Sequence, residues 1–86
     1  MHRVYRFTRN RDSLSNSQLS TDALNAVQAM ARALPQGSYN ELAQVDHESD
    51  VAAVVSFDLS DDVTDEQVDA ALRAGCQRYG VGAARE

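Results

Sequence analysis

The chain has 86 residues, with 13 acidic and 8 basic side chains and a formal net charge of −5 at pH 7. This length predicts a single domain, residues 1–86. The single cysteine, Cys76, excludes an intramolecular disulfide, no apolar run approaches the roughly 18 residues of a membrane-spanning helix, and the first residues lack the apolar stretch of a signal peptide. We therefore predict a cytoplasmic protein with no membrane partner.

Residues 1–8 alternate as a strand, with Tyr5 and Phe7 on the face predicted to point inward. Residues 9–18 are polar and rich in serine and asparagine, which indicates a loop. A helix is predicted over 20–34, with Ser20 as its N-cap and Asp22 favouring the dipole of its first turn. Pro35 and Gly37 end it.

Residues 38–45 form a weaker alternating pattern and predict an edge strand, followed by a polar turn over 46–50. The strongest strand pattern is 51–59, VAAVVSFDL, in which every second residue from Val51 to Leu59 is apolar. Full burial of its large side chains would stabilise the fold by about 1.5–3 kcal/mol each. This segment is predicted to lie inside the sheet, paired with 38–45 in a hairpin.

A second helix is predicted over 64–79. Thr64 and Gln67 have the spacing of a capping box. Gly75 interrupts the helix interior at a cost of about 1 kcal/mol, which indicates a close approach by another element. Gly80 is a natural stop, and the tail VGAARE is expected to be mobile.

The predicted order is therefore β-α-β-β-α, an α+β fold with a three-stranded antiparallel sheet and two helices on one face. This order resembles a ferredoxin-like split βαβ unit that lacks its last strand. In that arrangement the first strand keeps a free edge, which is a docking site for another chain.

Catalytic and metal chemistry are poorly supported by the residue types present. The only histidines are His2 and His47, and we interpret Cys76 as a small buried thiol. The acids around His47 are spaced like the start of a calcium loop, but Val51 stands where that loop needs glycine. We therefore predict no catalytic residue, no metal and no cofactor.

Charge is distributed unevenly along the chain. The first eleven residues contain four arginines and no acid, whereas residues 33–72 contain no basic residue. Within that second segment the spacing of one helix face relates Asp62, Asp65, Glu66 and Asp69, which we call the acidic stripe, and Asp58 and Asp61 lie just upstream. The predicted partner-binding residues are the acids Asp58, Asp61, Asp62, Asp65, Glu66 and Asp69, together with Arg3, Arg6, Arg9 and Arg11.

Two explanations of the acidic stripe stay open. Acids favour the start of a helix, and Asp69 can pair with Arg73 four residues later, so the stripe can be a solvated helix face. Alternatively, the carboxylates are spaced about 5–6 Å apart, broadly comparable to phosphates along a nucleic-acid strand. They would then offer a phosphate-like surface to a basic cleft on another protein.

We therefore hypothesise a small acidic, non-enzymatic protein-binding module. In overall character it resembles phage-encoded inhibitors of host defence, such as anti-CRISPR and anti-restriction proteins, which implies a nucleic-acid-handling complex as its target. A first alternative is a nucleic-acid-binding or regulatory module that uses the arginine-rich first strand, although the excess of acids opposes phosphate. A second alternative is a homodimeric enzyme or ligand-binding domain with its pocket between copies.

Overall fold

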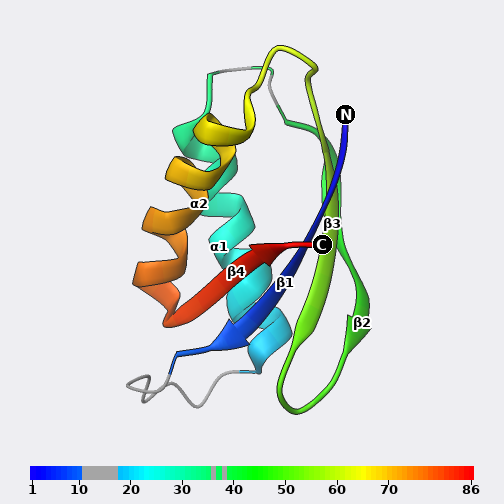
Figure 1. Ribbon diagram of the computed structural model, residues 1–86, viewed down its shortest axis with the longest axis vertical. Coiled ribbons are helices and arrows are strands. Elements are labelled where there is room, and N and C mark those ends of the chain that lie inside the picture. The colour runs from blue at the N-terminus through cyan, green and yellow to red at the C-terminus, as the bar shows by residue number, and fades with distance from the viewer. Residues whose placement is uncertain (11–17, 36, 38) are drawn as a thin grey trace.

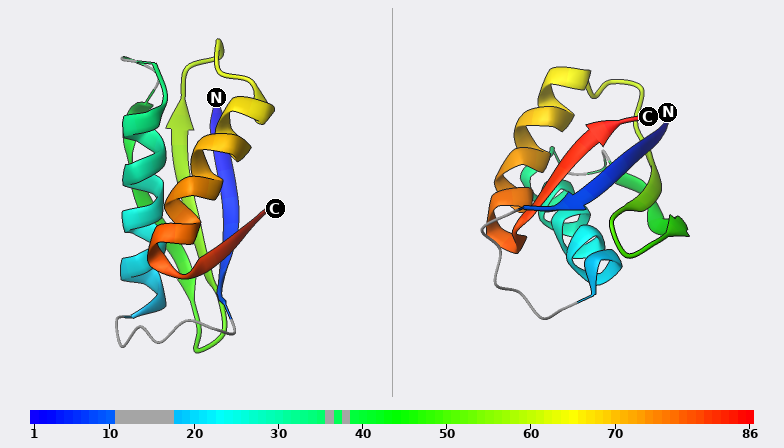
Figure 2. Two further views of the ribbon diagram at one scale, coloured as in Figure 1. Left: turned by 90° about the vertical axis from the view of Figure 1, so that its left-hand side faces the viewer. Right: turned by 60° about the horizontal axis from the view of Figure 1, so that its bottom comes forward.

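The computed structural model describes residues 1–10, 18–35, 37 and 39–86 (Figure 1). Along the chain it contains β1 (His2–Arg9), α1 (Leu19–Ala33), β2 (Tyr39–Glu48), β3 (Ala53–Leu59), α2 (Asp65–Tyr79) and β4 (Val81–Arg85). The strands form one sheet in the order β2-β3-β1-β4, and every neighbouring pair is antiparallel. Both helices lie on the same face of this sheet (Figure 2). The predicted α+β class and the placement of the helices are confirmed.

The sheet has four strands, so the prediction of three strands is wrong. The tail predicted to be mobile is β4, and it pairs with β1, with Arg85 opposite Tyr5 and Val81 opposite Arg9. Gly80 makes this return possible because its left-handed backbone (φ 69°) reverses the chain directly after α2. Val81 then fills the core with 1% of its surface exposed. The edge of β1 that was expected to be free is therefore occupied by the chain's own C-terminal segment.

The interior position predicted for 51–59 is confirmed, because β3 lies between β2 and β1. Its bounds differ, since β3 begins at Ala53 and Val51 is 70% exposed. Ser49 closes a tight turn before the strand, with its N–H donating to the Ala52 carbonyl over 2.8 Å. Val51 projects from this turn, so the prediction that it is buried is wrong.

β2 forms one border of the sheet, as predicted, but it continues to Glu48, where a turn had been expected from 46. Its register against β3 shifts at three places, between Tyr39 and Glu41, between Glu41 and Gln44, and between Val45 and His47. Such bulges bend and twist a strand locally. The acids around His47 therefore belong to an irregular edge strand and a short turn.

The capping box predicted for α2 is confirmed. The Thr64 hydroxyl accepts the Gln67 N–H over 3.2 Å, and the Gln67 side chain accepts the Thr64 N–H over 2.9 Å. The cap predicted for α1 is wrong, because the N-cap is Gln18 and Ser20 is buried in the first turn. Starting the helix earlier places Leu19 in the core, and burial of that side chain outweighs the hydroxyl cap.

The core lies between the sheet and the two helices. Phe7 is fully buried, and Tyr5 stacks on Phe57 with ring centroids 5.7 Å apart. The helices approach closely at Gly75, where an added Cβ would stand 2.6 Å from the Ala26 carbonyl oxygen. The close contact predicted from a mid-helix glycine is therefore confirmed.

Candidate functional site

The predicted acidic residues gather at one end of the molecule. Asp58 lies near the end of β3, Asp61 and Asp62 lie in the following turn, and Asp65, Glu66 and Asp69 lie on the first half of α2. Figure 1 shows this turn beside the N-terminus, at the end of the fold opposite the β2–β3 hairpin. We call the group formed by Asp58, Asp61, Asp62, Asp65 and Glu66 the acidic end.

Two of the predicted acids are neutralised inside the protein by arginines from two different strands. Arg3 on β1 forms an ion pair with Asp65. Arg85 on β4 reaches Asp65 over 2.9 Å and Asp69 over 3.5 Å. Asp69 also accepts a 3.0 Å hydrogen bond from the Tyr5 hydroxyl. These side chains tie α2 to the sheet, so Asp65 and Asp69 have a structural role.

The contacts within this group change the pKa of one side chain, Tyr5. Burial of the Tyr5 ring, together with its hydrogen bond to the Asp69 carboxylate, raises the pKa of the Tyr5 hydroxyl. The phenol therefore stays protonated and continues to donate to Asp69 at neutral pH. The hypothesised pair of Asp69 with Arg73 is replaced by contacts of Asp69 with Tyr5 and Arg85.

The remaining arginines of the first strand do not form one surface. Arg9 forms an ion pair with the buried Asp22 of α1. Arg6 is exposed and alternates with the inward-facing Tyr5 and Phe7, so it lies on the face of the sheet away from the helices. Arg11 lies outside the described residues. The described arginines of β1 thus divide between the two faces of the sheet.

The amino group of Met1 also contacts the acidic end. It lies 3.2 Å from a carboxylate oxygen of Asp58 and 3.3 Å from one of Asp61. Desolvation lowers the pKa of this amino group, but the hydrogen bonds and charges of Asp58 and Asp61 outweigh it and raise the pKa above its usual value. Asp61 nevertheless keeps a side chain that is 87% exposed.

Two acids of the acidic end have no ion-pair partner among the described residues. Asp62 and Glu66 are exposed, and among the described residues no cationic group lies within 4 Å of either. With Asp69 included, six carboxylates lie beside three cations that the described residues supply, namely the amino group, Arg3 and Arg85. A local charge of −3 therefore remains at this end of the fold.

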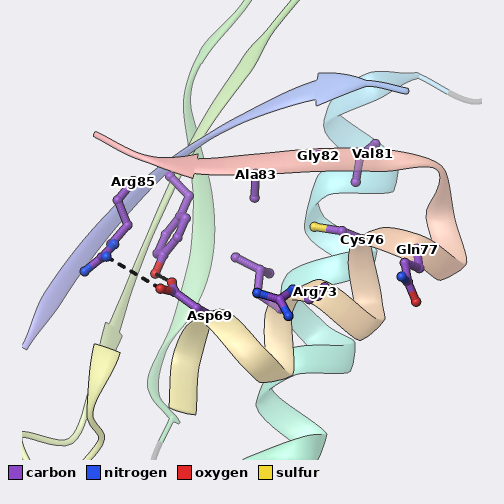
Figure 3. Close-up of a pocket in the computed structure, with 10 residues that line it drawn as sticks. Asp69, Arg73, Cys76, Gln77, Val81, Gly82, Ala83 and Arg85 are labelled. Carbon is purple, nitrogen blue, oxygen red and sulfur yellow. Dashed lines mark hydrogen bonds and ion pairs between the residues drawn. The ribbon is translucent and has the colours of Figure 1, made fainter. Parts of the chain in front are cut away.

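A cavity of about 380 Å³ lies between α2 and β4, next to these ion pairs (Figure 3). The helix contributes Asp69, Leu72, Arg73, Cys76 and Gln77, which are neighbours on one helix face. The strand contributes residues 81–83 and Arg85, and β1 contributes Tyr5. This cavity was not predicted from the sequence, because its second wall is β4, and residues 81–86 were expected to be a mobile tail. The one local signal in this segment is Val81, a large apolar residue directly after the Gly80 stop.

Cys76 is 7% exposed and lines this cavity, and burial raises the pKa of its thiol to about 11. The thiolate is the reactive form, so we expect the native protein at pH 8 to react with a disulfide reagent roughly 100-fold more slowly than the urea-unfolded chain. Absorbance of the released chromophore measures both rates. Equal rates in the two states would show that the thiol is not buried and that its pKa is not raised in the native protein.

Among the described residues, no group of three or more histidine, cysteine or acidic side chains is placed to hold a metal ion. In the same residues, no helix has the length and apolar character needed to cross a membrane. Comparison of the chain with protein-family models, curated proteins and solved structures found no match.

Proposed function

We propose that this protein is a small non-enzymatic binding module that docks through its acidic end on a basic surface of another protein. The supporting observation is that Asp62 and Glu66 are exposed at the end of the fold with no cation within 4 Å among the described residues. The highly exposed Asp61 lies beside them. A concentrated charge of one sign steers an oppositely charged partner and makes association depend on salt.

The proposed partner is a protein or complex that handles nucleic acid, and the proposed effect is inhibition. Such partners carry clefts of arginine and lysine that contact phosphates. Carboxylates at the start of a helix and in the preceding turn can form ion pairs with those arginine and lysine side chains in place of phosphates. Direct nucleic-acid binding by this chain is the weaker candidate, because Arg3 and Arg9 are already paired with Asp65 and Asp22.

The strand order β2-β3-β1-β4 supports one refinement of the fold proposal. We propose the complete ferredoxin-like split βαβ arrangement in place of the truncated one. In this arrangement the acidic end is formed by the β3–α2 connection and the first turn of α2, both of which are held by the capping box at Thr64.

The proposal is tested by reversing the two unpaired charges while leaving the structural ion pairs intact. We expect the double variant Asp62→Arg, Glu66→Arg to bind its partner about tenfold more weakly at low salt. The matched control is Glu48→Arg, Asp50→Arg, which makes the same charge change at exposed positions in the hairpin at the opposite end. Thermal unfolding checks that both variants are folded.

Binding is measured with immobilised protein and extract from the native host, followed by mass spectrometry and reconstitution with the purified partner. We expect nucleic-acid-binding proteins to be retained by the wild type and by the hairpin control, lost with the double variant, and released by added duplex DNA. If the double variant retains the same proteins as the wild type, the acidic end is not the docking surface.

A further inference from the structure

We propose that the cavity between α2 and β4 binds a small carboxylate with a compact apolar body. The volume of about 380 Å³ is in the range of pockets that hold small organic ligands. This inference goes beyond the proposed docking function, because it uses a different part of the molecule and does not involve Asp62 or Glu66.

The inner wall of the cavity is apolar. Leu72 and Val81 line it with 2% and 1% of their surface exposed, and the buried Cys76 also lines it. Figure 3 shows the Cys76 side chain extending from α2 alongside β4, with Val81 and Ala83 on the strand above it. Burial keeps the Cys76 thiol protonated, so this wall carries no charge. An apolar ligand body placed here would be removed from water.

The rim of the cavity supplies one available cation. Arg73 is exposed, and among the described residues no carboxylate lies within 4 Å of its guanidinium group. Asp69, one turn earlier on α2, is directed instead towards Arg85 and the Tyr5 hydroxyl (Figure 3). A guanidinium group binds a carboxylate through two parallel N–H···O bonds. Gln77, one turn later on α2, also lines the cavity.

The charges around the cavity favour a monoanion. Asp69 stands at one end and would repel a second negative charge on the ligand, whereas Arg73 and Arg85 would repel an amine. Two sources of such a ligand share this chemistry. One is a free carboxylic acid, and the other is the C-terminal residue of a peptide. A peptide could also pair along β4, which is the last strand of the sheet and pairs with β1 alone among the described strands.

The first test uses hexanoate as the probe, with hexanol and hexylamine as the neutral and cationic analogues. Binding is followed through the backbone amide resonances of residues 81–83 in an NMR titration. We expect saturable shifts with hexanoate, at least tenfold weaker binding of hexanol, and no saturable shifts with hexylamine. Equal binding of the three probes, or no saturable shift with any carboxylate, would overturn the proposal.

Variants locate the interaction within the cavity. Arg73→Gln should weaken hexanoate binding about tenfold, and Ala83→Leu, which fills the space from β4, should abolish it. Arg78→Gln is the matched control, because Arg78 is on the same helix but lies over the Tyr79 ring, outside the cavity. All three positions are exposed, and the amide spectrum confirms that each variant is folded. An equal loss in Arg73→Gln and Arg78→Gln would show that only net charge matters and would overturn the proposal.

A second arm distinguishes the two sources. The peptide acetyl-Gly-Ala-Leu is titrated with a free C-terminal carboxylate and as its C-terminal amide. Tighter binding of the free-acid peptide than of hexanoate, with loss on amidation, identifies a peptide C-terminus as the ligand. Tighter binding of hexanoate identifies a free carboxylic acid. Equal binding of the peptide acid and its amide would show that the carboxylate is not recognised and would overturn the proposal for peptides.

Discussion

Replacing Val81 by aspartate is expected to destabilise the protein by about 3 kcal/mol or more, because it places a carboxylate where the side chain is 1% exposed. A typical domain has only about 5–15 kcal/mol of stability, so the loss would remove a large share of the free energy of unfolding. Urea denaturation followed by circular dichroism measures the change.

The matched control for this substitution is Ala84→Asp, which makes the same chemical change three residues later on the exposed surface of β4. It is expected to change the free energy of unfolding by no more than about 0.5 kcal/mol. Equal, small effects of the two substitutions would mean that residues 81–85 do not pack on the fold, and the cavity would then lose one of its walls.

Replacing Gly75 by alanine is expected to destabilise the protein by about 1–3 kcal/mol, although alanine is the better helix former by about 1 kcal/mol. The added methyl group would stand 2.6 Å from the Ala26 carbonyl oxygen, and that atom belongs to a helix backbone that cannot rotate away. The helices would have to separate, which loosens the packing of the core around them.

Gly82→Ala is the control for Gly75→Ala. The new Cβ would meet only side-chain atoms, namely Asn10 Oδ1 at 3.4 Å and Thr8 Oγ1 at 3.8 Å, and these can adjust. We expect a change within about 0.5 kcal/mol, measured by the same urea titration. A Gly75→Ala protein as stable as the wild type would show that the helices are not held at this distance.

Most of the fold follows from local patterns. The alternation in 51–59, the Thr64–Gln67 spacing and the aromatic pair Tyr5 and Phe7 each placed an element or a face correctly. The fourth strand escaped prediction because Val81 is its only large apolar residue, and five residues of mostly glycine and alanine give too little alternation. Its pairing depends on a distant partner, β1, and such pairing is invisible in a local window.

The candidate site was predictable only in part. The acids were expected on an exposed surface, and Asp61, Asp62 and Glu66 are exposed. The ion pair of Arg3 with Asp65 joins residues 62 positions apart in the sequence, so no spacing rule could indicate it. The same fold that brings Arg3 and Arg85 to α2 pairs Asp65 within the acidic end, so the proposed docking depends on Asp62 and Glu66, and it leaves Arg73 exposed at the cavity.

The repeated register shifts of β2 affect how copies of the protein can associate. A bulged, twisted border with acidic side chains is a poor template for an incoming strand. Among the described strands, the opposite border is β4, which pairs with β1 without a register shift. A molecule with one competent border can join a second molecule and then has none left, so sheet-to-sheet contact ends at a closed pair and cannot propagate into a fibre.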